Sequence, residues 1–299
     1  MYMFNFRLQV FYTVAKRLSF TKAAEELFIS QPAVTKHIKE LEDQFNLPLF
    51  TRKGNKILLS PAGKTLLKHT EHLQEIYRRI EFEMNQFNQT QKGTLHVGSS
   101  TSITQYILPP LLAQFHSTHQ EVKVELLNGN SEQIEQALLN KDIELGILES
   151  KSKRREIHYT PFLKDEIVLV CSSKNHLAKN DEISPEELKH INLLLREPGS
   201  GTLEVIADTL KQKGIRLSDL QVEMQLGSTE AIKSYLQHSD CMAFISIHAI
   251  FDELKNNTLK IIEIKELQFL RDFYFITPLG PLGGLPELLI QFLTRNHKL

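Results

Sequence analysis

Serine and threonine hydroxyls are concentrated in four short segments of the C-terminal part of the chain, and these residue types suit a binding site for a small ligand. The segments 98–102, 128–131, 198–202 and 227–229 each follow a run of β-forming residues and precede a helical pattern. Helices begin with outward-pointing N–H groups, so turns that share one cleft would bind a small anion such as a carboxylate, a phosphate or a sulfur oxyanion. The candidate residues are Ser99, Ser100, Thr101, Ser102, Ser200, Thr202, Ser228 and Thr229.

Two alternatives remain open for this set. Serine and threonine are common helix N-caps, and each turn taken singly is explained by capping alone. Arg196 directly precedes the third segment and would add a positive charge to the cleft, or it would form an ion pair at the surface. Glu149 and Ser150 lie where the chain is expected to cross to a second lobe, which makes them hinge candidates.

A second set of residues is suited to reading DNA. Residues 20–45 predict two helices joined by a tight turn, with Ser30 as N-cap and a buried stripe of Val34, Ile38, Leu41 and Phe45. The opposite face and the helix starts carry the candidates for contacts to base edges and phosphates: Thr21, Ser30, Gln31, Pro32, Thr35, Lys36 and Lys39. The alternative is an amphipathic helical pair with a solvated polar face.

The elements around this helical pair support the DNA interpretation. A helix over 5–17 completes a three-helix core, and residues 49–52 and 56–59 predict a hairpin whose basic residues Arg52 and Lys53 would contact phosphate or a minor groove. A surface hairpin with solvated charges is the competing account. Residues 1–68 contain eleven Lys and Arg against five Asp and Glu, whereas the whole chain has a net charge of −1. This asymmetry favours one polyanion-binding end.

A long helix is predicted from Pro61 to about Gln89, because this stretch has helical periodicity and no internal proline. Its apolar residues recur at steps of four and three, the pattern of a helix packed lengthwise against another helix. We therefore expect a dimerising linker helix that uses Leu66, Leu73, Tyr77, Ile80, Met84 and Phe87. Packing against its own chain is the alternative.

Residues 91–299 alternate β-rich and helical runs, which predicts an α/β domain with largely parallel sheets. Strands are expected at 94–98, 122–127, 143–148, 167–171, 191–195, 222–226, 242–246, 259–264 and 273–277. The helices between them are expected near 103–117, 131–140, 203–213, 229–237 and 284–296.

Other functions have little support in the sequence. It contains no nucleophile elbow, no phosphate loop and no zinc-protease helix, so neither an enzyme nor a metal or cofactor site is predicted. The only cysteines, Cys171 and Cys241, are expected to be buried structural thiols in a reducing compartment. We find no signal-peptide pattern and no apolar stretch of membrane-spanning length, so a soluble, cytoplasmic protein without a membrane partner is expected.

The combined pattern resembles the LysR-type transcriptional regulators along essentially the whole chain. The resemblance lies in Ser19-Phe20-Thr21-Lys22-Ala23-Ala24, in residues 29–38 around Ser30-Gln31-Pro32, in Leu49-Phe50-Thr51-Arg52 and in Leu59-Ser60-Pro61-Ala62-Gly63. Segment 195–202 is similar to that of a subgroup linked to sulfur assimilation or carbon fixation, whose effectors are small anions. Leu203 follows where those members usually have arginine, and Lys36 and His37 stand where arginine and glutamine are frequent.

The resemblance implies a winged helix-turn-helix over 1–60, a dimerisation helix over 61–90 and a two-lobed effector domain over 91–299, similar to type 2 periplasmic binding proteins. Lobe I would comprise about 91–163 and 266–299, and lobe II about 164–265. It further implies binding to interrupted inverted-repeat DNA, homodimers that join into tetramers, contact with RNA polymerase, and an effector held between the lobes by residues such as Ser100, Thr101, Ser102 and Thr202.

Two other classes are weighed against this regulator. A solute-binding protein of transport would have the same C-terminal fold, but it would carry a signal peptide in place of a basic N-terminal domain. A metabolic enzyme would require a nucleophile, base or metal constellation. Turnover by the C-terminal domain is the result that would favour an enzyme.

Overall fold

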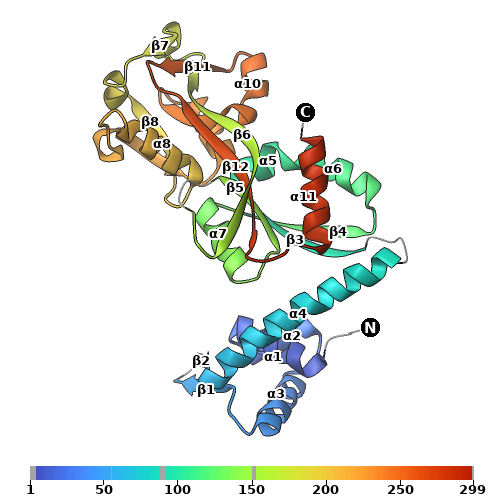
Figure 1. Cartoon of the computed structure of the whole chain (residues 1–299). Coiled ribbons are helices and arrows are strands. Elements are labelled where there is room, and N and C mark those ends of the chain that lie inside the picture. Colours follow the sequence, from blue (N-terminus) through green and yellow to red (C-terminus); the bar gives the residue numbers. More distant parts are fainter. Residues whose placement is uncertain (1–4, 55, 88–91, 150–152, 298–299) are drawn as a thin grey trace. The chain divides into compact units, whose positions relative to one another are not determined.

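The computed structural model describes residues 5–54, 56–87, 92–149 and 153–297. The chain forms two compact units, Met1–Thr90 and Gln91–Leu299 (Figure 1). The first unit contains α1 to α4 and a two-stranded hairpin, and the second contains a large mixed sheet with helices on its faces.

Three short helices build the core of the N-terminal unit: α1 (Phe6–Arg17), α2 (Phe20–Leu27) and α3 (Gln31–Phe45). The hydroxyl of Ser30 caps α3 by accepting a hydrogen bond from the backbone N–H of Ala33 at 3.3 Å. Val34, Ile38 and Leu41 are buried, as the helical periodicity predicts. The predicted burial of Phe45 is wrong: its side chain is 44% exposed, because it is the last residue of α3.

A hairpin and a long helix follow. β1 (Phe50–Lys53) pairs antiparallel with β2 (Lys56–Leu59), and α4 spans Pro61–Phe87. The Ser60 hydroxyl fixes the start of α4, because it donates to the carbonyl of Pro48 at 2.6 Å and accepts from the N–H of Gly63 at 2.9 Å. A side chain at Gly63 would overlap the carbonyl oxygen of Leu49, so only glycine allows this close packing.

The C-terminal unit is built on a ten-stranded sheet among the described residues, with the order β4-β3-β5-β12-β6-β10-β8-β9; β11 pairs with β6, and β7 pairs with β11. The strands are β3 Gly93–Ser100, β4 Val122–Gly129, β5 Leu145–Glu149, β6 Ile157–Ser172, β7 Glu182–Ile183, β8 Asn192–Arg196, β9 Gln221–Leu226, β10 Met242–Ser246, β11 Leu259–Ile264 and β12 Phe269–Pro278.

The sheet is mixed, and the prediction of largely parallel sheets is incomplete. β6 and β12 pair antiparallel over their whole shared length, from Phe269 opposite Ile167 to Pro278 opposite Ile157. The sequence predicted only one end of each of these strands. Their other ends contain several polar and charged residues and therefore lack the apolar run by which buried strands are recognised.

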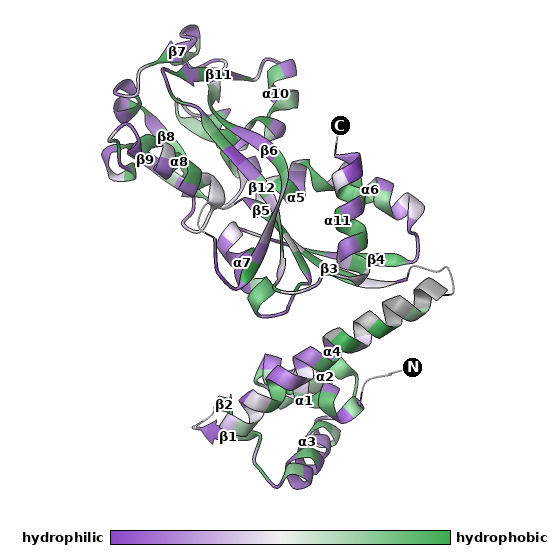
Figure 2. Ribbon diagram, in the orientation of Figure 1, coloured by the Kyte–Doolittle hydropathy of each residue, from purple (hydrophilic) through white to green (hydrophobic). Residues whose placement is uncertain are grey.

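These two long strands connect two lobes, each with its own hydrophobic core. The first lobe contains β3 to β5 with α5 (Thr101–Tyr106), α6 (Leu108–Thr118), α7 (Ser131–Leu139) and α11 (Gly284–Asn296). The second contains β7 to β11 with α8 (Gly201–Lys211), α9 (Thr229–Leu236) and α10 (Phe251–Lys255). α11 has one hydrophobic and one hydrophilic side (Figure 2), and its buried residues are Leu285, Leu289 and Leu293.

Within the part of the chain that the structure describes, none of the helices combines the length and the apolar composition needed to cross a membrane.

Candidate functional site

A buried cluster of charged side chains lies where the two lobes meet, with Arg271 at its centre. Arg271 on β12 and Asp165 on β6 are cross-strand neighbours, and the Arg271 Nε donates to Asp165 Oδ2 at 2.6 Å. The Nη1 of the same guanidinium lies 3.1 Å from Glu149 Oε1 and 2.8 Å from Thr202 Oγ1. One arginine therefore joins the end of β5 in the first lobe to the start of α8 in the second.

Glu149 is the second organising residue of this cluster. Its carboxylate accepts a hydrogen bond of 2.5 Å from the Ser100 hydroxyl and one of 3.4 Å from the Thr202 hydroxyl, in addition to the Arg271 contact. Its backbone carbonyl accepts from Ser131 Oγ at 2.6 Å. A side chain at Gly201 would overlap this same carbonyl, so the first turn of α8 can approach β5 only because residue 201 is glycine.

Asp165 is held from the second lobe as well. Its Oδ1 accepts from the Ser246 hydroxyl at 2.7 Å and lies 3.9 Å from His248 Nε2. Glu149 and Asp165 are almost fully buried together with Arg271. The cluster therefore combines two carboxylates with one guanidinium, and its contacts from Thr202 to Arg271 and Glu149 depend on the relative position of the two lobes.

Two buried polar atoms near this cluster have no hydrogen-bond partner among the described residues: Nη2 of Arg271 and Oγ of Ser200. Ser200 is the N-cap of α8 and its hydroxyl makes no cap hydrogen bond. Buried polar groups are nearly always satisfied in folded proteins. An unpartnered guanidinium N–H and a hydroxyl beside a helix start are therefore groups that a polar ligand could satisfy.

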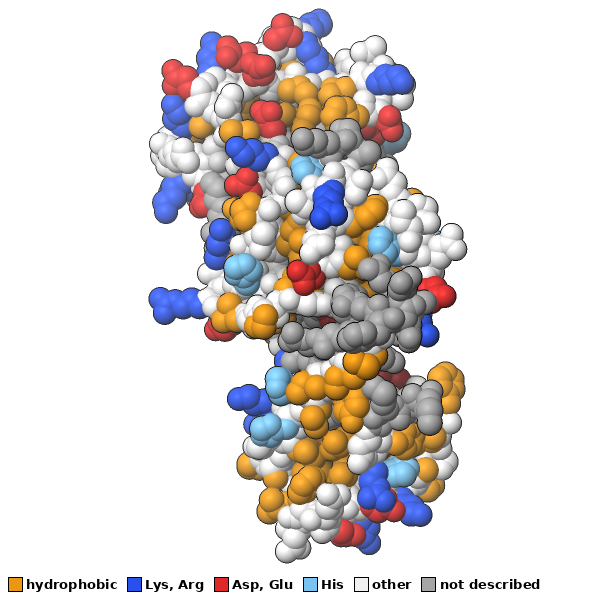
Figure 3. Space-filling view, turned by 45° about the vertical axis from the view of Figure 1, so that its right-hand side comes forward, with side chains coloured by type: hydrophobic (Ala, Val, Ile, Leu, Met, Phe, Trp, Pro, Cys, Tyr) orange, Lys and Arg blue, Asp and Glu red, His pale blue; other side chains and the backbone are white. Residues whose placement is uncertain are grey.

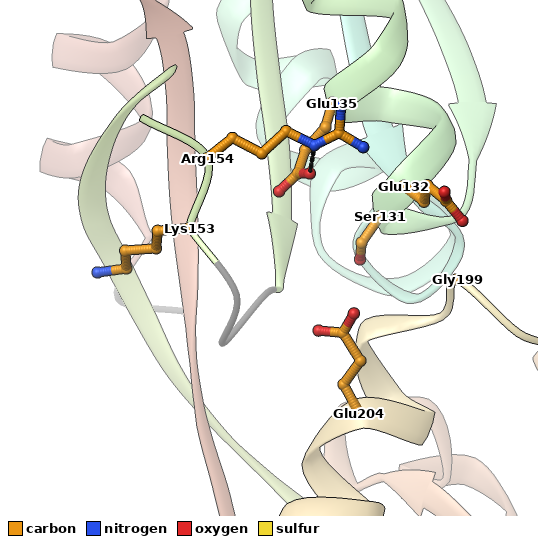
Figure 4. A pocket seen from close by; sticks show the side chains of 7 residues that line it. All are labelled: Ser131, Glu132, Glu135, Lys153, Arg154, Gly199 and Glu204. Atoms are coloured by element: carbon orange, nitrogen blue, oxygen red, sulfur yellow. Dashed lines mark ion pairs between the residues drawn. The ribbon is translucent and has the colours of Figure 1, made fainter. Parts of the chain in front are cut away.

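A pocket of about 290 Å³ opens beside this cluster, between α7 and α8 (Figure 4). Its lining residues are Ser131, Glu132, Glu135, Lys153, Arg154, Gly199 and Glu204. Ser131 and Glu204 point toward one another across the pocket, and Arg154 Nε forms an ion pair of 2.8 Å with Glu135 Oε2. The pocket meets the cluster through Ser131, whose hydroxyl contacts the carbonyl of Glu149.

The structure brings only some of the hydroxyl residues singled out from the sequence to this cluster. Ser100 and Thr202 contact the same carboxylate, and Ser200 lies two residues before Thr202. Ser99 and Ser102 are buried, while the Thr101 hydroxyl donates to the carbonyl of Gly129 at 3.4 Å.

The remaining candidates occupy the second lobe. Ser228 caps α9 through the backbone N–H of Ala231 at 3.5 Å, and Thr229 is buried in the first turn of that helix. Arg196 is buried and paired with Glu197 at 2.8 Å, so its charge is balanced by its own neighbour.

Another polar network joins the lobes at Tyr106, the last residue of α5. Its hydroxyl donates to the carboxylate of Glu230 on α9, and Lys233 Nζ lies 2.9 Å from Glu230 and 2.7 Å from Glu253. Lys233 Nζ also lies 5.1 Å from the centre of the Tyr106 ring. Burial raises the pKa of the Tyr106 hydroxyl, and the hydrogen bond to Glu230 raises that pKa further. The tyrosine therefore stays a neutral donor at physiological pH.

Sequence reasoning missed Asp165 and Arg271 and treated Glu149 only as a hinge candidate; Ser150 lies outside the described residues. A usable pattern existed for Arg271. Phe269, Phe273 and Phe275 alternate along β12 and are all buried, and Arg271 is in phase with them. A charged residue in the inward phase of a strand must find a buried partner, which marks it as a candidate for a site or an ion-pair cluster.

The exposed face of α3 carries the residues proposed to read DNA. Gln31, Pro32, Thr35, Lys36 and Lys39 are exposed, as are Thr21 and Ser30. The amide Nε2 of Gln31 donates to the Thr35 hydroxyl at 3.1 Å, and that hydroxyl donates to the Gln31 carbonyl at 3.1 Å. The two side chains therefore form a preorganised pair. On the hairpin, Arg52 and Lys53 are exposed at the end of β1.

The apolar residues of α4 divide into two groups. Leu66 and Leu67 pack against the core of the N-terminal unit. Leu73, Ile76, Ile80 and Met84 are exposed, between 38% and 52%, and Tyr77 is half-buried; the side chain of Phe87 lies outside the described residues. Hydrophobic side chains gather on the face of the N-terminal unit shown in Figure 3. This unit thus has more apolar surface than its own residues cover.

Comparisons with known proteins identify both units. The model of the LysR substrate binding domain matches residues 88–298, and that of the bacterial regulatory helix-turn-helix protein, lysR family, matches residues 6–64. The HTH-type transcriptional regulator CysL of Bacillus subtilis is 28% identical over 292 residues, 97% of each chain. A probable RuBisCO transcriptional regulator of Synechocystis is 33% identical over 272 residues, 89% of this chain and 78% of that one.

Among solved structures, the regulatory domain of CcmR from Synechocystis, in complex with 2-PG, superposes with a TM-score of 0.63 at 25% identity. The match covers 69% of this chain and 98% of the CcmR domain. These relatives are transcriptional regulators and not enzymes. With an N-terminal helix-turn-helix and a two-lobed effector-binding domain, the chain belongs to the LysR family of bacterial transcriptional regulators.

Proposed function

We propose that this regulator senses a small metabolite in the cleft between its lobes and transmits that state to an interrupted inverted-repeat operator. The observation that carries the proposal is the bridge from Glu149 through Arg271 to Thr202, which links the two lobes by hydrogen bonds and an ion pair. A ligand that competes for these groups would change the preferred arrangement of the lobes. An effector can act only through such a difference in affinity between two arrangements.

The size and chemistry of the cleft suit a small polar metabolite. A volume of about 290 Å³ lies at the lower end of small-molecule sites. Unpartnered polar atoms of Arg271 and Ser200 are available beside it. The CcmR domain in complex with 2-PG supports a small metabolite as the class of effector. The direct contacts proposed here are Ser100, Thr202, Ser200 and Arg271.

DNA recognition is assigned to the exposed face of α3 and to the hairpin. The Gln31 and Thr35 pair would read base edges, because side chains near the N-terminus of a recognition helix reach furthest into the major groove. Lys36, Lys39, Arg52 and Lys53 would contact phosphates. An inverted-repeat operator needs two such surfaces, which we propose are supplied by a dimer formed through the exposed stripe of α4.

The proposed function also concerns how the protein assembles and where it acts. Dimers would pair into tetramers, with RNA polymerase as a further partner when bound at a promoter. The protein would act in the cytoplasm, where its operator lies. The subgroup linked to sulfur assimilation or carbon fixation is supported by the regulators CysL and the probable RuBisCO regulator among the relatives.

The DNA part is tested by selecting operators from random duplexes with the full-length protein and measuring affinity over a range of salt concentrations. Lys36→Ala and Arg52→Ala should each weaken binding and reduce the slope of log K against log salt by roughly 1, because each loses one phosphate contact. Lys211→Ala, an exposed lysine of α8, is the matched control. Unchanged slopes in both variants would show that these side chains do not contact DNA.

The ligand part is tested with Thr202→Ala. Because Thr202 is proposed to touch the effector and not the DNA, the variant should lose its response to an identified ligand while its operator affinity without ligand stays nearly unchanged. Equal loss of both would reject this division between the two units.

A further inference from the structure

The charge of the cleft restricts the class of effector, an inference that rests on the proposed function. The hydroxyls of Ser100 and Thr202 and the Nη1 of Arg271 are the donors that a small oxyanion would be expected to use. All three already contact the carboxylate of Glu149. An incoming oxyanion would have to lie against a buried carboxylate or displace it, and either event carries a large electrostatic cost.

Among the described residues, two other cationic side chains at the junction of the lobes are paired with carboxylates of their own and do not offset this negative charge. Asp165 adds a second buried carboxylate, and Arg271 is the guanidinium that both acidic groups share. Arg196 is neutralised by Glu197 at 2.8 Å, and Lys233 lies between Glu230 and Glu253.

The adjoining pocket has the same excess. Its lining contains three glutamates, Glu132, Glu135 and Glu204, against Lys153 and Arg154. Arg154 is committed to Glu135 by an ion pair of 2.8 Å, and Lys153 Nζ lies over the ring of Tyr274 at 4.3 Å. Within the described part of the chain, the pocket and the cluster together therefore contain five carboxylates and three Lys or Arg side chains.

Two other buried groups could donate a hydrogen bond to an acceptor on the ligand. Nη2 of Arg271 is a buried donor without an acceptor among the described residues, and it would pair with a carboxylate or carbonyl oxygen of the ligand. The hydroxyl of Ser200, also without a partner there, can either donate or accept. The site thus offers several carboxylates to a cationic group and a single guanidinium N–H to an acceptor.

We propose that the effector is a small zwitterion of the amino acid class, whose ammonium group is recognised by Glu149 and the pocket glutamates and whose carboxylate is recognised by Arg271 and Ser200. Charge-assisted hydrogen bonds of both signs would hold the two ends in fixed positions. A simple oxyanion such as sulfate could pair only with Arg271 and Ser200 and would leave the carboxylates of the site without a cationic partner.

The test measures the melting temperature of the full-length protein with the twenty standard amino acids, with the N-acetyl derivative of each active compound, and with sodium sulfate and sodium phosphate. Acetylation removes the cation and leaves the carboxylate. At least one amino acid should raise the melting temperature at millimolar concentration. Its N-acetyl derivative should bind at least tenfold more weakly, and the two anions should do no more than sodium chloride at equal ionic strength.

The deciding variant is Glu149→Gln, which keeps the shape of the side chain and removes its charge. It should lose at least tenfold in affinity for the active amino acid and should gain specific stabilisation by sulfate or phosphate. Glu266→Gln, at an 81% exposed side chain paired with Lys213, is the matched control and should behave like wild type. Sulfate stabilises many proteins by exclusion from their surface, and this control measures that general effect.

Circular dichroism and the unliganded melting temperature show whether Glu149→Gln is folded. If it is not, Glu204→Gln at the half-buried rim of the pocket takes its place and should weaken amino acid binding several-fold. The proposal is overturned if no amino acid stabilises the wild type, or if the N-acetyl derivatives bind as tightly as the amino acids. It is also overturned if a folded Glu149→Gln variant gains no affinity for sulfate or phosphate.

The same experiments distinguish a wrong ligand class from a wrong effector site. Tight binding of sulfate or phosphate that Thr202→Ala abolishes would keep the cleft as the effector site and reject only the ligand class. Stabilisation by any compound that neither Thr202→Ala nor Glu149→Gln affects would place binding outside the cleft, against both proposals.

Discussion

The hydroxyl of Tyr106, at the end of α5 in the first lobe, donates a hydrogen bond to the carboxylate of Glu230 on α9 in the second lobe. Tyr106 also packs against the hydrophobic core of the second lobe, so it crosses between the lobes with both its ring and its hydroxyl. This contact lies outside the Arg271 cluster. The arrangement of the lobes is therefore held at two separate polar junctions.

Tyr106→Phe should remove one junction without leaving a cavity, because phenylalanine keeps the ring. We expect a loss of about 1 kcal/mol in the free energy of unfolding of the C-terminal domain at pH 8, the usual net value of one hydrogen bond. Urea denaturation followed by circular dichroism measures this loss.

The pH dependence of this difference gives a second, independent measurement. The pKa of Tyr106 is raised in the folded state, so its contribution is fully present below the ordinary tyrosine pKa of about 10 and is lost as the pH rises beyond it. The advantage of wild type over Tyr106→Phe should be constant from pH 7 to 9 and should shrink above pH 10. An advantage that grows with alkaline pH would contradict the hydrogen bond to Glu230.

Arg271→Ala should destabilise the C-terminal domain far more strongly. It would leave Glu149 and Asp165, which are 2% and 4% exposed, without their shared cation. Breaking a buried ion pair in this way costs roughly 3–5 kcal/mol. Adding Glu149→Gln to Arg271→Ala should restore part of the loss, because it removes one of the two unpaired charges. Additive losses in this double-mutant cycle would show that the two residues are not coupled.

The N-terminal unit was predictable because its determinants are local. Ser30 caps α3 and Pro32 follows in the first turn, as the sequence predicts from residues within a few positions of each other. Burial of Val34, Ile38 and Leu41 follows from the same periodicity. The prediction for Phe45 was wrong because helical periodicity shows which face of a helix is apolar but not how far along the helix its neighbours bury that face. That extent depends on tertiary packing.

The interlobe cluster was only partly predictable, since its members are separated by 49 to 122 positions. Ser100 and Thr202 were found because hydroxyls at helix starts are visible in sequence. Their common partner Glu149 was not recognised as such, because the sheet order brings β5 beside β12 and the packing of α8 brings Thr202 to both strands. The sequence therefore indicated where the cleft lies, but only the structure showed which charged side chains meet there.

The two cysteines should be unreactive in the folded protein. Burial raises the pKa of Cys171 to about 11, and burial followed by the hydrogen bond to Glu223 raises that of Cys241 to about 11. At pH 7 only roughly one thiol in ten thousand would be the reactive thiolate. Ellman's reagent should label both cysteines rapidly in 6 M guanidinium and neither in buffer over the same time. Rapid labelling of the native protein would reopen a redox role.

The stripe on α4 leads to a prediction that separates dimerisation from folding. Leu73→Glu and Ile80→Glu each place a charge at an exposed apolar position, so sedimentation velocity should show monomers in place of dimers. The N-terminal unit should stay folded, and its melting temperature should fall only because the stabilisation by dimerisation is lost. Leu66→Glu should instead unfold the unit, because Leu66 packs against its core. Lys68→Glu, at an exposed polar position of the same helix, controls for the change of charge. A dimer that survives both Leu73→Glu and Ile80→Glu would exclude the helix as the dimer interface, since a glutamate pair buried at either position would be too costly to retain.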